Sequence, residues 1–282
     1  MSQRLQLDAP AKLNLSLAVT GRRADGLHEL ASTFALLELA DRLVLRPGLP
    51  GLEVRVADGE DVPADPARNL AWRGLLAGLG GEPSERLVLE KRIPAAAGLG
   101  GGSSDAAGGW RLGRRRRGLD ERPDDAVLQE LARIGADVPF FAAQLPAAEV
   151  RGIGERVVAS GTRSAHVVLV LPPFRLSTAA VFAELRERDW TRVPQPGHND
   201  LLAPARRLRP ELDDIRRLVL TAGAEAHLTG SGSTLYVLLD DAERASALAG
   251  RLARAGLRAL RTRLAQRAAS IATINEEESE TE

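Results

Sequence analysis

Four glycines fall within the five positions 98–102, and two serines and an aspartate follow at 103–105. Glycine has no Cβ, so the backbone of such a loop can approach a ligand closely. Serine and aspartate are favoured N-cap residues, so we expect a helix to begin at 103–105, with its first free N–H groups completing an anion site. We therefore interpret 94–104 as a loop that binds the phosphates of a nucleotide; a glycine-rich turn without a ligand is the alternative.

This loop matches neither of the two common phosphate-binding fingerprints. A Walker loop requires a lysine and then a serine or threonine after its last glycine, and no lysine follows these glycines. The dinucleotide-binding pattern requires a glycine at its sixth position, which is Ser103 when counted from Gly98 and Asp105 when counted from Gly100. The loop therefore indicates phosphate binding of another kind.

Only two of the 38 basic residues are lysines, Lys12 and Lys91, and the others are arginines. Arginine is planar, forked and permanently charged, whereas lysine is a compact point charge. The two lysines therefore mark positions where a guanidinium would not serve, with chance retention as the alternative. Lys12 is the stronger candidate because polar residues accompany it.

Lys12 belongs to a predicted strand in which apolar and polar residues alternate with a period of two. The apolar positions, which are expected to face a core, are Leu13, Leu15, Leu17 and Val19. Lys12, Asn14 and Ser16 share the opposite face, which points either into a cleft or into water. A glycine turn at 21–26 then leads to His28, a lone histidine that is either structural or placed to contact a polar ligand.

An acidic candidate, Asp137, precedes a dense apolar cluster in the sequence Gly-Ala-Asp-Val-Pro-Phe-Phe at 135–141. Because Pro139 disfavours a helical conformation at Val138, we expect Asp137 on a sharp, non-helical corner. A carboxylate at the edge of an apolar cluster either caps the next helix or accepts a proton, and its position alone does not decide between these roles.

The composition excludes several classes of site. Lys+Arg and Asp+Glu both total 38, so the chain has no overall attraction to nucleic acid or to an anionic membrane. No cysteine is present, which excludes disulfides and thiolate metal sites, and the four histidines lack metal-ligand spacing. The N-terminus lacks a signal-peptide pattern, and the longest strongly apolar run, 167–171, is too short for a bilayer. We therefore expect a cytoplasmic protein without nucleic-acid or membrane partners.

Strands lead the first half of the chain and mix with helices in the second half, which indicates an α+β fold. Short N-terminal strands are expected at 33–37, 42–46, 52–56 and 87–93, and helices at 69–79, 105–117, 126–134, 178–185, 210–220 and 241–255. A second glycine loop at 229–234 is either part of a site or a plain hairpin turn. The expected domains are an N-terminal domain at 1–160, a C-terminal domain at 161–270 and an acidic, disordered tail at 271–282.

In combination, the motifs resemble those of the GHMP kinases, the superfamily of galactokinase, homoserine kinase and mevalonate kinase. Three motifs follow the family's order: Ala-Pro-Ala-Lys-Leu-Asn-Leu at 9–15, the loop at 94–107 and Leu-Thr-Gly-Ser-Gly-Ser at 228–233. Similarity to the branch whose substrate is cytidine-diphosphate methylerythritol lies in four segments, 10–15, 24–30, 98–107 and 135–141, and Arg-Gly-Ile-Gly-Glu at 151–155 also matches. The resemblance implies a two-lobed fold, in which an N-terminal mixed sheet with helices faces a C-terminal α/β-sandwich lobe across the active-site cleft.

The resemblance also implies ATP-dependent phosphoryl transfer to the 2-hydroxyl of the methylerythritol unit, in the non-mevalonate pathway of isoprenoid synthesis. Lys12 and Asp137 match the catalytic pair, in which Asp137 would accept the proton of the alcohol and Lys12 would stabilise the charge. ATP and Mg²⁺ are the implied cofactors, with Ser104 as a metal or phosphate contact. The positions that match the ATP site are Asn69, Lys91, Pro94, Ala95, Ala96, Ala97, Gly98, Leu99, Gly100, Gly101, Gly102, Ser103 and Ser104.

On the acceptor side, the matching positions are Asn14, Leu27, His28, Thr178 and Phe182. His28 would contact the edge of the cytosine, and Phe182 would stack on its face. The family usually has tyrosine before this histidine, so Leu27 would lose part of the stacking energy, about 1 kcal/mol. The expected partner is this small molecule, bound by a monomer or a weak homodimer.

Two alternatives accompany this interpretation. The first is a GHMP kinase of the homoserine or mevalonate type, which Leu27 favours slightly and the motifs at 24–30 and 135–141 oppose. The second is a catalytically silent nucleotide- or RNA-binding protein of the same fold. Zero net charge and the intact pair of Lys12 and Asp137 argue against it.

Overall fold

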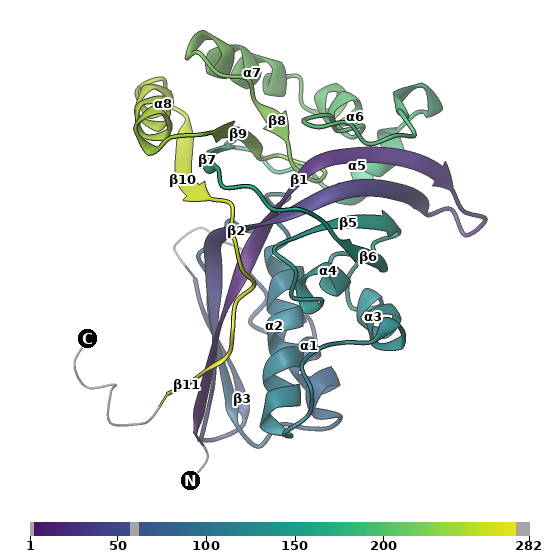
Figure 1. Ribbon diagram of the computed structural model, residues 1–282, viewed down its shortest axis with the longest axis vertical. Helices are drawn as coiled ribbons and strands as arrows, with labels where there is room; N and C mark the ends of the chain where they lie inside the picture. The colour runs from purple at the N-terminus through teal and green to yellow at the C-terminus, as the bar shows by residue number, and fades with distance from the viewer. Residues whose placement is uncertain (1–2, 57–61, 275–282) are drawn as a thin grey trace.

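The computed structural model describes residues 3–56 and 62–274, and within them the strands form two sheets in two lobes (Figure 1). The N-terminal sheet contains β1 (Arg4–Arg22), β2 (His28–Arg46), β3 (Gly51–Arg55), β4 (Arg86–Glu90), β5 (Ala147–Gly152), β6 (Arg156–Ala159) and β11 (Ala272–Ile274). The C-terminal sheet contains β7 (His166–Leu171), β8 (His227–Leu228), β9 (Leu235–Leu239) and β10 (Arg258–Arg263). Because β3 and β4 run parallel whereas the other pairs are antiparallel, the N-terminal sheet is mixed, as expected.

The helices of the described residues alternate with these strands and lie against both sheets (Figure 1). They are α1 (Leu70–Leu79), α2 (Gly101–Arg116), α3 (Asp125–Ala132), α4 (Val138–Ala142), α5 (Thr178–Glu184), α6 (Leu202–Leu208), α7 (Glu211–Thr221) and α8 (Ala242–Arg254). None of the helices within 3–56 and 62–274 combines the length and the apolar character needed to cross a membrane.

Strands β1 and β2 form one long antiparallel hairpin that links the two lobes. Each strand has 19 residues, so the short strands expected at 33–37 and 42–46 are parts of a single strand. Register shifts around Lys12 and Asn14 mark β-bulges, which redirect side chains. Figure 1 shows the hairpin reaching from the N-terminal lobe to α5 and α6, and Leu17 of β1 packs into the core of the C-terminal lobe.

Helices α1 and α2 pack against one face of the N-terminal sheet and touch each other at glycine positions. The side chain of Asn69 caps α1 by accepting hydrogen bonds from two N–H groups of its first turn, and Gly80 ends it with φ of 65°, as the sequence predicts. A Cβ at Gly74 would lie 1.9 Å from the carbonyl oxygen of Ala106. The close approach of α1 to α2 therefore requires glycine at this position.

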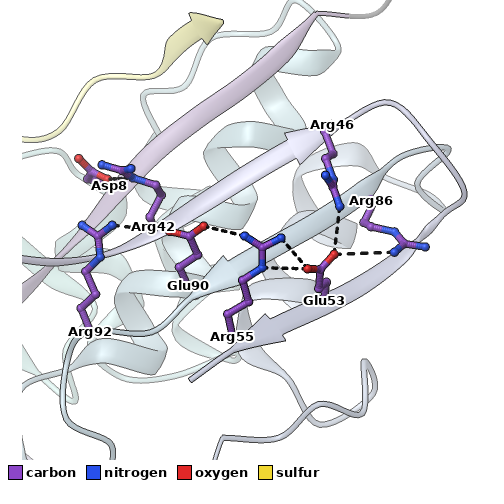
Figure 2. Close-up of polar contacts among 8 residues, drawn as sticks. All are labelled: Asp8, Arg42, Arg46, Glu53, Arg55, Arg86, Glu90 and Arg92. Atoms are coloured by element: carbon purple, nitrogen blue, oxygen red, sulfur yellow. Dashed lines mark hydrogen bonds and ion pairs between the residues drawn. The ribbon is translucent and has the colours of Figure 1, made fainter. Parts of the chain in front are cut away.

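The other face of this sheet carries a network of ion pairs, which we name the arginine lattice (Figure 2). Its members are Asp8, Arg42, Arg46, Glu53, Arg55, Arg86, Glu90 and Arg92. Glu53 pairs with Arg55 at 2.7 Å, and Arg55 also reaches Glu90 at 3.1 Å. Val44 and Val88 share this face by strand alternation, yet both are buried. The aliphatic stems of the arginines therefore help to shield apolar residues on the outer face.

After β10 the chain returns to the N-terminal sheet. Leu264 forms a bridge with Leu37, Ile271 is buried in the core beneath α1 and α2, and β11 pairs with β1. The expected C-terminal domain to 270 and disordered tail from 271 are therefore wrong for residues 264–274, because their apolar side chains find places in the N-terminal core. The acidic residues of the expected tail, at 276–282, lie outside the described residues.

Candidate active site

A cleft of about 1210 Å³ opens between the two lobes. Residues of β1, β2, the glycine loop at 94–100, α2, α5 and the second glycine loop line it. Small-molecule sites usually enclose about 300–1,000 Å³, so this cleft has room for two ligands. All the site residues that the sequence predicts line the cleft except Ser104.

The glycine loop adopts a conformation that depends on left-handed backbone positions. Ala96, Gly98 and Gly100 have φ values of 53°, 77° and 73°. A Cβ at Gly98 would lie 2.6 Å from the carbonyl oxygen of Thr229. Glycine at 98 is thus needed both for the backbone turn and for contact with the second glycine loop.

Helix α2 begins at Gly101 with Gly100 as its N-cap, so the expected start at 103–105 is wrong. The N–H of Ser104 already donates to the carbonyl of Gly100 at 2.9 Å, which leaves the N–H groups of 101–103 without partners inside the helix. Within the described residues, no side chain caps this end and no acidic residue lies in the first turn. The positive end of α2 therefore faces the cleft, ready for an anion.

The second glycine loop is part of this site, so it is more than the plain hairpin turn left open by the sequence. The N–H of Gly230 donates to Oδ1 of Asn14 at 2.8 Å, and the hydroxyls of Ser231 and Thr178 lie 2.8 Å apart. The N–H of Thr234 donates to the carbonyl of Ala97 at 3.4 Å. These contacts join β1, α5 and the phosphate-loop candidate around one end of the cleft.

Lys12 and Asp137, which the resemblance pairs as catalytic residues, meet in the structure. Nζ of Lys12 lies 3.2 Å from Oδ2 of Asp137 and donates to Oδ1 of Asn14 at 2.7 Å. The lysine side chain is 4% exposed and sits over the ring of Phe34 at 4.5 Å. The backbone N–H of Lys12 donates to the carbonyl of Leu99 at 2.9 Å. The ammonium is therefore fixed beside the glycine loop, and the carboxylate faces the cleft.

The backbone at Asp137 differs from the expected non-helical corner. Asp137 has φ of −88° and ψ of −9° and is the N-cap of α4, with Pro139 in the first turn. A proline is tolerated there because first-turn N–H groups have no helical partner. The side chain of Asp137 makes no capping hydrogen bond. Of the two roles left open by the sequence, capping is therefore wrong, and the carboxylate is available to Lys12 and to a ligand.

Lys91 lines the cleft but is already held by two carboxylates. Its Nζ contacts Oδ2 of Asp41 and lies 2.6 Å from Oδ2 of Asp105, and all three side chains are buried. Burial alone would lower the pKa of Lys91, but the charges of Asp105 and Asp41 outweigh burial and raise it. A contact of Lys91 with adenine stays a prediction. No sequence pattern assigned a role to Asp41, and the need of a buried lysine for acidic partners was the only available signal.

Asp105 is the carboxyl of this cluster whose charged form is disfavoured by burial. Oδ1 of Asp41 accepts from the N–H groups of Arg92 at 2.6 Å and Ile93 at 2.8 Å, whereas Oδ1 of Asp105 has no hydrogen-bond partner among the described residues. Burial raises the pKa of Asp105 to about 8, against the opposing charge of Lys91. The cluster thus ties Asp41 of β2 and Lys91, the residue after β4, to the first turns of α2.

Two predicted residues, Asn69 and Asn14, have structural tasks as well as places in the lining of the cleft. Both ends of the Asn69 amide are used, since Nδ2 donates to the carbonyl of Pro63 at 2.7 Å while Oδ1 caps α1. The amide of Asn14 is likewise occupied, because its Nδ2 donates to Oγ of Ser32 at 2.9 Å. Oγ of Ser104 is buried without a partner among the described residues, and no group of three metal-ligating side chains occurs within 3–56 and 62–274.

Three acceptor-side residues, Leu27, His28 and Phe182, lie at the tip of the β1–β2 hairpin. The other two lie further into the cleft, since Asn14 contacts Lys12 and Thr178 contacts Ser231. The ring of His28 stacks on Phe182 with centroids 5.4 Å apart, and Leu27 beside it is 50% exposed. Burial, followed by the charge of Arg22, lowers the pKa of His28. Trp190 also contacts His28; sequence reasoning missed it, because no local pattern surrounds this tryptophan.

Two family models match the chain: "GHMP kinases N terminal domain" over residues 69–144 and "GHMP kinases C terminal" over residues 181–258. A 4-diphosphocytidyl-2-C-methyl-D-erythritol kinase from Desulfotalea psychrophila is 38% identical over 260 residues, which cover 84% of this chain and 86% of that relative. The enzyme of the same name from Thermus thermophilus is 39% identical over 256 residues, covering 84% of this chain and 88% of that relative.

Solved structures agree with these matches. A crystal structure of 4-(cytidine 5'-diphospho)-2C-methyl-D-erythritol kinase superposes with a TM-score of 0.74 at 36% identity, covering 92% of this chain and 98% of that chain. Homoserine kinase from Cytophaga hutchinsonii superposes with a TM-score of 0.67 at 16% identity, covering 97% and 98%. The second likeness concerns the fold alone.

Proposed function

The chain belongs to the 4-diphosphocytidyl-2-C-methyl-D-erythritol kinase family of the GHMP kinases, and from this premise we propose that it phosphorylates the 2-hydroxyl of that cytidine-diphosphate alcohol with ATP. The reaction belongs to the non-mevalonate route to isoprenoids. The named relatives align over most of their own length, so the proposal concerns the whole kinase and not an isolated domain.

The observation that carries this proposal is the contact between the Lys12–Asp137 pair and the glycine loop. Lys12 donates its N–H to Leu99, and a Cβ at Gly100 would lie 3.0 Å from Cγ of Lys12. The pair therefore stands beside the uncapped N-terminus of α2. A phosphate bound at that helix end would have a carboxylate and an ammonium next to it, as phosphoryl transfer to an alcohol requires.

In the proposed mechanism, Asp137 accepts the proton of the acceptor hydroxyl as that oxygen attacks the terminal phosphorus of ATP. The bond between this phosphorus and the β–γ bridging oxygen breaks, and ADP leaves. Lys12 stays charged between Asp137 and Asn14 and stabilises the negative charge that develops on the attacking oxygen. The N–H groups of the glycine loop and of α2 orient the phosphates. Positioning and charge stabilisation supply most of the rate enhancement in reactions of this kind.

ATP supplies the phosphoryl group when it is bound, and the glycine cradle with its free N–H groups suits its phosphates. We propose Mg²⁺ as the accompanying ion, held chiefly by phosphate oxygens and water, as is usual for this metal. The carboxylates near the loop, Asp105 and Asp137, are already paired with lysines. Ser103 lines the cleft and Ser104 does not, so Ser103 is the better placed hydroxyl for this ion or for a phosphate.

The test is ADP release from the purified protein with Mg-ATP and three acceptors in parallel: the cytidine-diphosphate alcohol, mevalonate and homoserine. We expect turnover with the cytidine substrate alone. Turnover with mevalonate or homoserine instead would contradict the substrate but keep a kinase. Absence of turnover with all three, together with ATP binding by calorimetry, would favour a silent nucleotide-binding protein.

A further inference from the structure

The corner of the cleft around His28 is built from three rings, two of which come from the C-terminal lobe. The imidazole of His28 stacks on Phe182 of α5 with an interplanar angle of 28°. Trp190 meets the same imidazole at 90°, with centroids 5.9 Å apart. Leu27, the chain neighbour of His28, contributes no ring. The orientation of His28 therefore depends on the two C-terminal rings.

Trp190 is held in place on both sides by its chain neighbours. Asp189, at the end of the 3-10 helix Glu187–Asp189, pairs with Arg207 of α6 at 2.6 Å. The N–H of Thr191 donates to Oδ2 of Asp200 at 2.9 Å, and the same oxygen accepts from the N–H of Val19 in β1 at 2.7 Å. The carboxylate of Asp200 is fully buried. The chain on either side of Trp190 is thus tied to α6 and to β1. The indole Nε1 itself is buried and has no hydrogen-bond partner among the described residues, so the ring is placed by its flanking residues and by packing.

The stacked rings determine where a base can lie. A third ring between two parallel rings needs a separation of roughly 7 Å, twice the contact distance of carbon atoms, and His28 and Phe182 are only 5.4 Å apart. A base therefore lies beside this pair rather than between its members. The direction in which the imidazole presents its nitrogens then decides which base edge it can meet.

We propose that Trp190 is a positioning residue for substrate recognition, whose ring holds the His28 imidazole against Phe182 so that its nitrogens face the pyrimidine edge of the substrate. This inference rests on the proposed function, which supplies the cytosine. A neutral imidazole offers one donor and one acceptor, which suits a base edge that carries an amino group beside a ring-nitrogen acceptor. Trp190 also covers His28 from water and so favours this neutral form.

The kinetic test compares Trp190→Ala, Trp190→Phe and the wild type. In Trp190→Ala we expect KM for the cytidine substrate to rise about 3- to 10-fold, the loss of one edge-to-face aromatic contact. We expect kcat and the KM for ATP to stay within about twofold, because Lys12, Asp137 and the glycine loop are untouched. Trp190→Phe keeps a ring edge at the same place and should recover most of the affinity.

A double-mutant cycle with His28→Ala tests whether Trp190 acts through the imidazole. In the His28→Ala background, Trp190→Ala should change KM little further, because the group it positions is gone. Additive effects would overturn the proposal, as would an unchanged KM in Trp190→Ala. If kcat fell and the KM for ATP rose by as large a factor as the KM for the cytidine substrate, Trp190 would have a general structural role. That result would also overturn the proposal.

Titration of the four histidines by NMR separates this inference from the proposed function, because it needs no substrate. The pKa of His28 is lowered by burial and then by Arg22. Trp190→Ala removes part of the burial and keeps the arginine, so the pKa of His28 should rise toward 6.5. An unmoved His28 titration would contradict the positioning role. Wild-type turnover with another acceptor would contradict only the cytidine substrate.

Discussion

The cleft and the arginine lattice both contain ion pairs between basic and acidic side chains, but the pairs of the cleft are buried and those of the lattice are exposed to water. In the cleft, Lys12 and Lys91 are 4% and 6% exposed, and each is held by aspartate. In the lattice, Arg55 is 54% exposed and pairs with Glu53 and Glu90, which are also accessible to water (Figure 2). Removing one partner of a buried pair leaves an uncompensated charge, whereas an exposed pair contributes little. Burial, more than the number of pairs, therefore decides what each charge does.

The two regions also shift carboxyl groups in opposite directions. Burial raises the pKa of Asp105 to about 8 although Lys91 touches it. In the lattice, the hydrogen bond from Arg55 lowers the pKa of Glu53. Burial acts in the opposite direction there, but its effect is smaller. Burial in the cleft thus favours the protonated form of Asp105, and the hydrogen bond from Arg55 favours the ionised form of Glu53.

The contrast explains why the two lysines of this arginine-rich chain both lie in the cleft. A Cβ at Gly101 would lie 3.3 Å from Nζ of Lys91, and a Cβ at Gly100 would lie 3.0 Å from Cγ of Lys12. Gly100 and Gly101 have no side chains, yet their backbones lie so close to Lys12 and Lys91 that there is little free space around the two lysines. A compact ammonium fits such a position, whereas a planar guanidinium suits the open lattice.

The largest effect is expected from Asp137→Asn in the cleft. The amide cannot accept the proton of the acceptor hydroxyl, so kcat should fall about 10³- to 10⁴-fold. The change also removes the carboxylate that pairs with the buried ammonium of Lys12, so the melting temperature should fall as well. The kcat values are therefore compared at a temperature at which both proteins are folded. ADP-release kinetics measure this loss, with Glu53→Gln in the lattice as the matched carboxyl-to-amide control. A variant that kept a tenth of the wild-type kcat would rule out the proton-acceptor role.

The next effect concerns stability. Lys91→Met removes the only ammonium that faces Asp41 and Asp105 in the described structure, and the buried carboxyl group of Asp41 loses its cationic partner. The free energy of unfolding should fall by about 3–5 kcal/mol, measured by urea denaturation. A loss below about 1 kcal/mol, the range of exposed pairs, would show that the cluster behaves like the lattice.

Asp105→Asn should change the pH dependence of stability. The pKa of Asp105 is raised from 3.8 to about 8, so between these values the folded protein binds a proton that the unfolded chain releases. Wild-type stability from this group is therefore full below pH 4 and is lost as the pH rises toward 8. The stability of Asp105→Asn relative to wild type should increase over this range, as urea denaturation at several pH values can measure. A difference independent of pH would contradict the raised pKa.

The smallest effect is expected from Glu53→Gln in the lattice. This change breaks the pair with Arg55, but both groups keep access to water, so the loss should be below about 1 kcal/mol. Urea denaturation at low and at high salt would measure it, and the loss should shrink with salt because exposed charges are screened. A loss above about 2 kcal/mol at either salt concentration would exceed the contribution of an exposed ion pair. It would mean that the lattice contributes to stability as a buried network does.

Local chemistry in the sequence determined much of the site. Glycine preferences located the phosphate-loop candidate, Asn69 and Gly80 bounded α1, and the rarity of lysine selected Lys12 and Lys91. These features depend on residues close together in the chain, because caps and left-handed turns are decided by one or two side chains. Even here the start of α2 was misplaced, since Gly100 capped it ahead of the serines.

The tertiary structure alone decided which side chains meet. Lys12 could be paired with Asp137 only by resemblance, and neither the partners of Lys91 nor the contact of Trp190 with His28 followed from any local pattern. The return of β11 to β1 was missed for the same reason. Periodicity and capping describe neighbours along the chain, whereas burial, which gives these charges and rings their roles, depends on segments that folding brings together from distant positions.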